Sequence, residues 1–498
     1  MADVQNIVSV ASQAVNDDTM IIAVVDRQGN VLAVFRKPNA PNTAIGDYGL
    51  TVNANDLAVG LAHAAGLFSI DQAPLSTRSL RFLGEVHFPP GVMNTGDGDL
   101  YSIETSNSGC TLTNNYLPGQ ALPPSTALGG GPGLGIVTGK PDVMDSDPTA
   151  VNPGGVPIFK NNANGDTFMV GAVGVVASNL DVAEFVAFSG AFSPGFGLAV
   201  PFPGEVNIGG VALPFVKNTT RPAGFTAGDA TGTYFLGPLA SPGPAPFGDL
   251  IAPTNGPIGG LTAAQVTEIL DAGEATANVT RSAIRLPLGS RARMTIAVAD
   301  LDGTLIGLRH QRDATIESID VAVTLARNMV YYNGPNVIPG DLPAFPAGTA
   351  ISNNTTNFLA QPFFPPGIDG TQPGFLFPKY VQSTQNVCQQ GSQPPGPNQS
   401  GTTFLASGGT GLFDSSGKLI GGLGVRGDGE DRDDFVANGA ASGGPNQVPT
   451  CSGVNCFLPA PARRADQLCV NAAGTVVNCG SNGAVRLPFS KFPRNPTQ

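Results

Sequence analysis

The chain has 498 residues, a formal net charge of −12 at pH 7 and charged side chains at only 12% of its positions, about half the share of an ordinary soluble domain. The chain has 25 Lys and Arg residues and no basic stripe. This argues against a nucleic-acid-binding surface, because phosphate binding needs clustered cations. No apolar stretch has the length of a membrane helix, so we expect no membrane span. The length allows two domains with cores of ordinary size.

A helix and a β-hairpin are the first elements that the sequence predicts. Apolar residues at positions 4, 7, 8, 11 and 15 recur at helical spacing, which predicts an amphipathic helix over residues 4–15. Residues 22–36 then hold two aliphatic runs on either side of Asp26-Arg-Gln-Gly29. The aspartate can bond to its own backbone and the glycine supplies the positive φ of a tight turn, so we predict a hairpin.

Further landmarks follow this hairpin in the first half of the chain. A second amphipathic helix begins at Asp56, and a rigid Pro-Pro-Gly loop ends the segment 82–91. A short glycine-containing strand at 170–175 leads to a helix near Asp181, and a Leu-Pro-Phe strand at 213–215 closes the unit. Together these elements outline one mixed α/β unit.

The same landmarks recur in the same order in the second half. The second hairpin spans residues 296–310, with Asp300 and Gly303 in the roles of Asp26 and Gly29. The others are a helix at 261–270, a helix from Asp320, a Pro-Pro-Gly loop in 358–367, a glycine strand at 420–425, a helix near Asp431 and a Leu-Pro-Phe strand at 487–489. This common order predicts two tandem domains rather than a solenoid. The predicted boundaries are 1–222, a Gly/Pro-rich linker at 223–258, and 259–498.

These motifs resemble those of the GlcG/HbpS family, also called the haem-degrading or haem-binding domain. The resemblance rests on the hairpins, the Asp-x-Ala helices and the Gly-x-x-Gly-Val strands, and is strongest at residues 23–35, 56–67, 297–308, 320–326 and 411–436. It implies an α/β (α+β) fold with a central antiparallel sheet and helices packed on one side of it. It also implies self-association and, in some secreted members, binding of haem or a related tetrapyrrole. The long inserts of this chain depart from the compact family.

Long inserts and six cysteines distinguish the chain further. Segments rich in Gly, Pro and Asn lie within residues 101–153 and 334–398, and irregular loops of this length are uncommon unless they bind or pack on something. The cysteines fall in loop-like sequence without a Cys-x-x-Cys pair, which favours disulfides over a zinc site. They are Cys110, Cys388, Cys451, Cys456, Cys469 and Cys479.

We predict that the last four cysteines pair among themselves, as Cys451–Cys456 and Cys469–Cys479 or exchanged, because they are crowded in one loop-rich tail. Disulfides predict an extracytoplasmic location, secreted or at the cell surface. The first residues, Met1-Ala-Asp-Val-Gln, lack the basic and apolar segments of a signal peptide, so a signal peptide has been removed or the location is wrong.

Three histidines are the candidates for metal or haem ligation. His63 lies in the helix that begins at Asp56, and we expect a structural residue at the rim of the sheet. His310 ends the second hairpin where Arg36 ends the first, which predicts a polar position facing solvent. The counterpart of His63 is also an arginine, Arg327, so neither histidine is a strong ligand candidate.

His87 is the candidate haem ligand. It lies directly before Phe88-Pro-Pro on a rigid loop beside aromatic residues, a setting in which an imidazole can reach haem iron between apolar walls. Its counterpart in the second half is Phe363, so we predict at most one haem per chain. A structural role for His87 is the alternative.

Two acidic clusters are candidate calcium sites, Asp97–Asp99 after the first Pro-Pro-Gly loop and Asp428–Asp434 after the second glycine strand. Alternating carboxylates near glycine are typical of calcium ligands, although neither cluster fits the EF-hand loop. For the second cluster the alternative is that the carboxylates stabilise the N-terminus of the following helix through its dipole.

The sequence does not support an enzyme. It has no Gly-x-Ser-x-Gly motif, no cysteine in a catalytic context and too few histidines for a triad. Our first hypothesis is therefore a secreted haem- or tetrapyrrole-binding protein. The alternative is a structural or self-assembling extracellular protein, because low charge and few lysines leave sheet edges unprotected.

Overall fold

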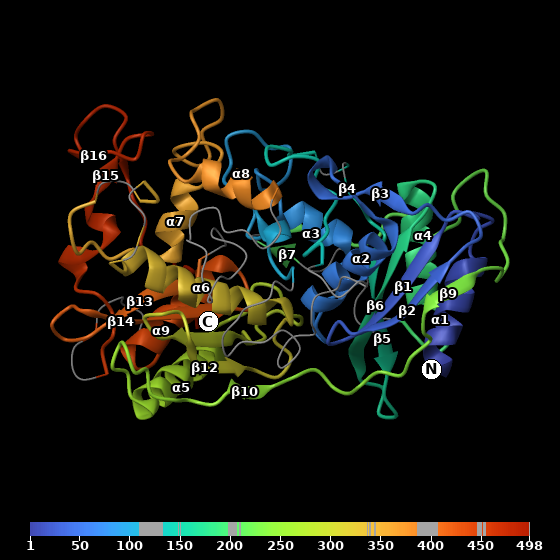
Figure 1. Ribbon diagram of the computed structural model, residues 1–498, viewed down its shortest axis with the longest axis horizontal. Helices are drawn as coiled ribbons and strands as arrows, with labels where there is room; N and C mark the ends of the chain where they lie inside the picture. The colour runs from blue at the N-terminus through green and yellow to red at the C-terminus, as the bar shows by residue number, and fades with distance from the viewer. Residues whose placement is uncertain are drawn as a thin grey trace.

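The computed structural model describes residues 1–108, 133–147, 149, 151–197, 207–208, 211–335, 337, 340–342, 345–385, 407–445, 451 and 455–497. It has a mixed α+β fold with antiparallel sheets, as the sequence predicts. Two five-stranded sheets, each with its own helices, lie toward opposite ends of an elongated molecule (Figure 1).

The first sheet contains the first predicted hairpin at its centre. Its strand order is β5-β6-β1-β2-β9, and every pair is antiparallel. The turn between β1 and β2 forms as predicted, because Gly29 has φ +90° and the Asp26 carboxylate accepts hydrogen bonds from the backbone N–H groups of Gln28 and Asn30. The strands are β1 (Ile21–Asp26), β2 (Val31–Arg36), β5 (Gly155–Asn161), β6 (Thr167–Val176) and β9 (Thr233–Leu236).

The second sheet has the same topology. Its order is β13-β14-β11-β12-β10, with the second predicted hairpin, β11–β12, at the centre. The irregularities match as well, since a bulge follows Val24 in β1 and Val298 in β11, and another follows Ile158 in β5 and Leu412 in β13. The strands are β10 (Gly248–Ile251), β11 (Thr295–Ala299), β12 (Leu305–His310), β13 (Gly409–Phe413) and β14 (Leu419–Arg426). Duplication and the domain boundaries at 222 and 259 stay predictions.

Helices cover both faces of each sheet, not one side as the family resemblance implies. In the first half, α2 covers the face that bears Ala23, whereas α1 and α4 cover the face that bears Ile22 and Val24. All residues of β1 are buried, so the strand needs an apolar partner on each side. In the second half α6 takes one face and α5 and α9 the other. The helices are α1 (Ala2–Gln13), α2 (Ala54–Phe68), α4 (Leu180–Ala191), α5 (Ala263–Val279), α6 (Glu317–Asn333) and α9 (Glu430–Ser442).

The glycines of the predicted glycine strands allow this close packing of helix on sheet. A Cβ atom at Gly174 in β6 would lie 2.0 Å from the carbonyl oxygen of Ala58 in α2. A Cβ atom at Gly424 in β14 would lie 2.0 Å from the carbonyl oxygen of Ala322 in α6. Only glycine fits, because any side chain there would displace the helix from the sheet.

The Leu-Pro-Phe segments at 213–215 and 487–489 do not form the strands that we predicted. Each lies against the start of a short helix, where the Ser79 hydroxyl donates to the Pro214 carbonyl at 2.6 Å and the Thr355 hydroxyl donates to the Pro488 carbonyl at 2.7 Å. These helices are α3 (Thr77–Leu83) and α7 (Asn353–Leu359). Two short strands precede the first Leu-Pro-Phe segment, β7 (Asn207–Ile208) and β8 (Val211–Ala212). The C-terminal tail contains β15 (Cys469–Val470), β16 (Val476–Val477) and β17 (Val485–Arg486).

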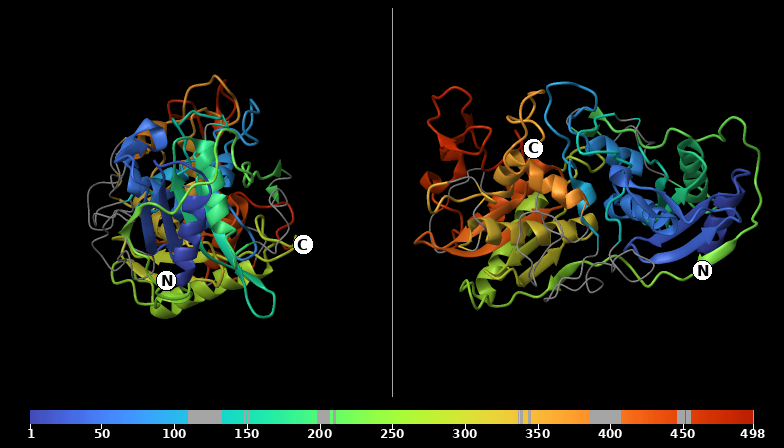
Figure 2. Two further views of the ribbon diagram at one scale, coloured as in Figure 1. Left: turned by 90° about the vertical axis from the view of Figure 1, so that its right-hand side faces the viewer. Right: turned by 45° about the horizontal axis from the view of Figure 1, so that its top comes forward.

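The segment predicted as a linker contributes a strand to each sheet. Residues 223–258 contain β9, which pairs with β2 of the first sheet, and β10, which pairs with β12 of the second. The segment therefore runs along the molecule from one sheet to the other, as Figures 1 and 2 show in green. It forms an edge of each sheet instead of hanging free.

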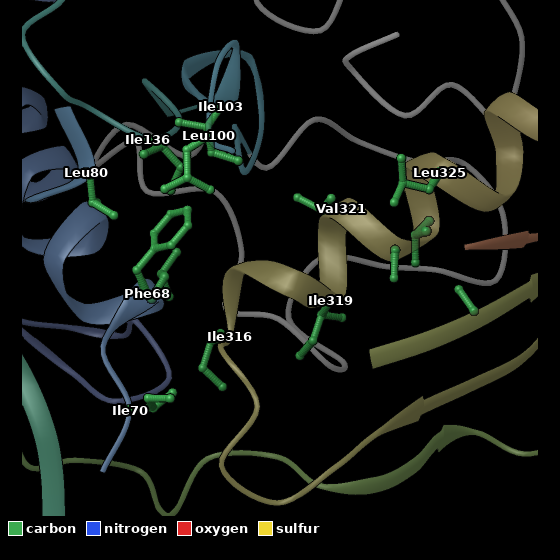
Figure 3. Close-up of a cluster of buried hydrophobic side chains, with 14 of the residues drawn as sticks. Phe68, Ile70, Leu80, Leu100, Ile103, Ile136, Ile316, Ile319, Val321 and Leu325 are labelled. Atoms are coloured by element: carbon green, nitrogen blue, oxygen red, sulfur yellow. The ribbon is translucent and has the colours of Figure 1, made fainter. Parts of the chain in front are cut away.

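One hydrophobic core joins the two halves. Side chains of the first half, including Phe68, Leu80 and Leu100, share a buried cluster with Ile316 and Ile319 at the start of α6 (Figure 3). Apolar area removed from water stabilises by about 25 cal/mol per Å². Because this cluster is contiguous, each half loses buried apolar surface if the other is removed.

A buried polar contact fixes the same junction. The Asp313 carboxylate accepts hydrogen bonds from Arg27, from Arg285 and from the backbone N–H group of Asp71. Arg285 is almost fully buried, with its Nη1 atom 2.7 Å from Asp313 Oδ2. Removing one partner of such a pair would leave the other charge buried and unpaired, which is strongly destabilising.

The helix–sheet contact at Gly424 can be tested by substitution. Gly424→Ala should lower the free energy of unfolding by about 2 to 3 kcal/mol, because the added methyl group overlaps the α6 backbone. Gly96→Ala is the matched control, since a Cβ atom there meets nothing within 4 Å. Urea unfolding of both variants measures the difference. Equal stability of the two would show that α6 does not pack this closely on β14.

Candidate functional site

His87 lies between the two Pro-Pro-Gly loops. Its Nε2 atom is 2.7 Å from Asp369 Oδ1, and its ring stacks on Phe363 with the centroids 5.9 Å apart. Only 7% of the residue is exposed, and Nδ1 has no hydrogen-bond partner among the described residues. The ring is therefore enclosed, so haem ligation by His87, which stays a prediction, would require Nε2 to leave Asp369 or the cover over Nδ1 to open.

The other two histidines have structural partners. His63 in α2 contacts the carbonyl oxygen of Gly29 through Nε2, and burial lowers its pKa to about 4. In the second half Arg327 Nε donates to the carbonyl oxygen of Gly303 at 2.8 Å, so both side chains hold the turn of a hairpin. This agrees with the structural role that we expected for His63.

The prediction that His310 faces solvent is wrong. The residue is 1% exposed, and its Nδ1 atom is 2.7 Å from the Thr295 hydroxyl oxygen. Burial, and after it the positive charge of Arg27, lowers the pKa of His310 to about 3. Strands β10 and β11 flank His310, which pairs with Gly248 and Thr295.

The acidic clusters do not form a metal site. Within the described ranges, no group of three or more His, Cys, Asp or Glu side chains could hold a metal ion. Asp97 accepts a hydrogen bond from Gln361 Nε2 at 2.8 Å. Asp428 and Asp434 accept hydrogen bonds from the backbone N–H groups of Ala283, Gly429, Gly408 and Lys491. Calcium binding therefore finds no support, whereas the first turn of α9 does carry acidic residues, as the helix-dipole alternative expects.

Asp434 makes stability depend on pH in a defined direction. Burial raises its pKa to about 7, so the folded chain holds a proton that the unfolded chain releases at lower pH. This contribution to stability is complete below the unfolded pKa of about 4 and is lost as pH rises to about 7. From pH 5 to pH 8, Asp434→Asn should therefore gain about 2 to 3 kcal/mol relative to wild type. Urea unfolding at both pH values, with Asp302→Asn as the exposed control, tests this. An equal response of the two variants would refute the shifted pKa.

Two disulfides form in the tail as predicted. Cys451 pairs with Cys456, and Cys469 pairs with Cys479. Cys110 and Cys388 lie outside the described residues. In the described parts of the chain, no helix has the length and apolar character needed to cross a membrane.

A cleft lies beside the tip of the β3–β4 hairpin, lined by residues of both halves. Its apolar lining comes from Leu50, Val52, Leu134 and Val137, and its hydroxyl groups from Thr105, Ser108, Ser383 and Thr384. Asp47, Tyr48 and Glu104 add two carboxylates and a phenol. Small-molecule sites combine apolar walls with a few polar groups in this way. The elements around it are β3 (Thr43–Ile45), η1 (Asp47–Gly49), β4 (Thr51–Asn53), η2 (Ile103–Thr105) and α8 (Phe377–Gln385).

Tyr48 occupies the centre of a polar network at this cleft. Its hydroxyl oxygen is 3.3 Å from Glu104 Oε2 and 3.3 Å from the hydroxyl oxygen of Tyr380, which α8 supplies from the second half. The backbone of Tyr48 is left-handed, with φ 56° and ψ 25°, a conformation that non-glycine residues rarely adopt. Its N–H group donates to the Lys140 carbonyl at 2.6 Å. Such strained residues persist where the surrounding structure holds them, often at functional sites.

Buried ionisable groups surround Tyr48. Asp47 accepts hydrogen bonds from the N–H groups of Thr138 and Gly139, and burial together with the Glu104 charge raises its pKa to about 7. Lys140 is fully buried, with Nζ 4.3 Å from the centroid of the Tyr101 ring, and burial lowers its pKa. Burial, and after it the Glu104 charge, raises the pKa of Tyr48, so its phenol keeps its proton near neutral pH.

Sequence reasoning did not find this cleft, because its residues come from inserts. The β3–β4 hairpin lies within residues 37–53, between β2 and α2, where the second half has only residues 311–316. Glu104 and Lys140 come from the first long insert and Tyr380 from the second. The one available signal was the length of these inserts, which indicated a binding or packing role without naming a residue.

Comparison with known proteins adds little. No protein-family model matches the chain, and no curated protein matches it. One similar solved structure is the Klebsiella pneumoniae protein ORFY, described with the family model DUF336, at 16% identity over 36% of this chain and 87% of that chain, with a TM-score of 0.23. Another is the complex of PduOC with haem, at 19% identity over 36% of this chain and 91% of that chain, with a TM-score of 0.23.

Proposed function

We propose that the chain is a haem- or tetrapyrrole-binding protein of the GlcG/HbpS type, and that its site is the cleft beside Tyr48. The observation that carries the proposal is the composition of this cleft, in which four aliphatic residues and four hydroxyl-bearing residues surround a phenol. A tetrapyrrole is a flat apolar ring with carboxylate side chains, so it needs both kinds of surface. The hairpin, helix and glycine-strand motifs support the same ligand class by resemblance.

Each part of the cleft has a role in this binding. The side chains of Leu134 and Val137 would contact the ring, and apolar burial would supply most of the binding free energy. The hydroxyl groups of Ser383 and Thr384 donate to the carbonyl oxygens of Lys379 and Val381, and would turn from these to donate to the carboxylate groups of the ligand. An iron in the ring would supply redox and gas-binding chemistry when bound.

The extracytoplasmic location belongs to the same proposal. Disulfides such as Cys451–Cys456 and Cys469–Cys479 form and persist in oxidising compartments. A secreted or surface protein of this kind would meet free haem outside the cell.

A structural or self-assembling role is the second candidate. The edge strand β9 exposes Tyr234 and Phe235, at 37% and 57%, and Leu239 follows at 45%. Exposed apolar edge strands can pair with a second chain. This candidate predicts association that rises with protein concentration in the absence of any tetrapyrrole.

Placing a bulky side chain in the cleft tests whether it is the binding site. Haemin and iron-free protoporphyrin, titrated separately into the purified protein, should each give a saturable absorbance change at the Soret band. Ser383→Trp places an indole in the cleft and should weaken both affinities at least tenfold. Ser481→Trp, at an exposed turn in the tail, is the matched control and should bind like wild type.

Two outcomes would count against this proposal. Normal binding by Ser383→Trp would place the ligand elsewhere in the chain. Absence of binding by wild type, together with concentration-dependent sedimentation, would favour the self-assembling alternative.

A further inference from the structure

We infer that the groove between α5 and α9 binds an organic ammonium ion, an amine that carries a short hydrocarbon chain. The described residues that line this groove all belong to the second half, whereas the cleft beside Tyr48 uses both halves. The groove has a volume of about 370 Å³, within the range of about 300 to 1,000 Å³ that small-molecule sites have. The inference goes beyond the proposed function and is independent of it, because the two sites share none of these residues.

The apolar part of the groove comes from two helices that lie side by side (Figure 1). They approach closely, since a Cβ atom at Gly439 of α9 would lie 2.2 Å from the hydroxyl oxygen of Thr276 in α5. Small and aliphatic side chains flank this contact and leave room above it. The apolar lining consists of Ile269, Ala272, Ala275, Ala440, Pro445 and Phe457. A hydrocarbon chain of a few carbons would lose contact with water along this surface.

Carboxylates supply the charge of the groove. Glu268 is exposed and has no hydrogen bond or ion pair with any other described residue. Asp271 pairs with Arg309 at 2.6 Å, but the same guanidinium group also pairs with Glu274 and Asp249. One cation therefore serves three carboxylates, and the part of the lining that the structure describes contains no Lys, Arg or His residue. The surplus negative charge would concentrate cations at this surface.

The two kinds of surface together define the ligand class. An ammonium group donates three hydrogen bonds, so the Glu268 carboxylate can accept one of them while the hydrocarbon chain covers the apolar lining. The net charge of −12 disfavours an anion of the same size. A bare metal ion does not fit, because no group of three or more acidic, His or Cys side chains in the described ranges could hold one.

The first half closes the matching surface between α1 and α4. There Phe192 packs against the core after the end of α4, and the Pro194 carbonyl accepts a hydrogen bond from Asn6 of α1 at 3.1 Å. After α9 the chain continues instead with Gly443 and Gly444. These residues have no side chain to place across the helices, so the surface between α5 and α9 stays accessible. We therefore expect one such site per chain.

A disulfide holds the remaining wall of the groove. Asn455 and Phe457 line this wall, on either side of Cys456, which is bonded to Cys451. The Phe457 N–H group donates to the carbonyl oxygen of Ala441 at 2.8 Å, which ties the wall to α9. A wall fixed in this way loses little conformational entropy when a ligand binds.

Hexylammonium is the probe, with hexan-1-ol and hexanoate as neutral and anionic ligands of the same chain length. In methyl NMR spectra of the intact protein, hexylammonium should shift the resonances of Ile269 and Ala272 saturably. The expected dissociation constant is about 1 mM, reasonable for a ligand of about seven non-hydrogen atoms. Hexan-1-ol and hexanoate should bind at least fivefold more weakly. Glu268→Gln should weaken hexylammonium binding at least threefold, because it removes the unpaired carboxylate.

Ala275→Phe tests the position of the site. Ala275 is an exposed residue of α5, and a phenyl ring there should occupy the groove and weaken hexylammonium binding at least tenfold. Ala264→Phe is the matched control, since Ala264 is exposed on the same helix and does not line the groove. It should bind like wild type. Circular dichroism of both variants excludes loss of fold as the cause of weaker binding.

Three results would overturn the inference. Equal affinities for hexylammonium, hexan-1-ol and hexanoate would show that the carboxylates do not select the ligand. Wild-type affinity in Ala275→Phe would place the ammonium ion elsewhere in the chain. The absence of a saturable shift at Ile269 and Ala272 would show that the groove binds no amine of this kind. None of these results bears on haem binding, which the titrations of the proposed function test separately.

Discussion

The apolar contact between α6 and the first half is the interaction on which the rest of the structure depends. Ile316 and Ile319 pack in one buried cluster with Phe68, Leu80 and Leu100, so the halves share this cluster in addition to the core that each has of its own. The Asp313 network lies at the same junction. Because the halves are held together, α8 of the second half lies beside η2 of the first, and the cleft can form between them.

The two Pro-Pro-Gly loops meet at the junction. His87 stacks on Phe363, the residue that we matched to it in the other loop, and Asn94 and Asp369 exchange hydrogen bonds there. The pairs Phe82–Phe88 and Phe358–Phe364 also have the same edge-to-face arrangement. The inserts differ between the halves. Residues 37–53 add the β3–β4 hairpin to the first half, where the second half has only residues 311–316.

Much of the fold could be predicted from the sequence, because hydrophobic alternation and turn residues are local signals. The hairpins around Asp26 and Asp300 and the helices from Asp56 and Asp320 were found in this way. The edge strands β9 and β10 were missed, since Gly and Pro around them indicated a linker. His310 is buried between β10, which lies in the segment predicted as a linker, and β11, so its burial could not be predicted from the hairpin alone. Tyr48 and Tyr380 are 332 positions apart, so only the folded chain brings them together.

We propose that residues of both halves form one ligand site. Native mass spectrometry of the intact chain with excess haemin measures this most directly, because it counts ligands on each chain. We expect one haem per chain at saturation, since only the first half carries the β3–β4 hairpin and only α8 supplies Tyr380. Two equivalent haems per chain would contradict the account, because each half would then hold a complete site of its own.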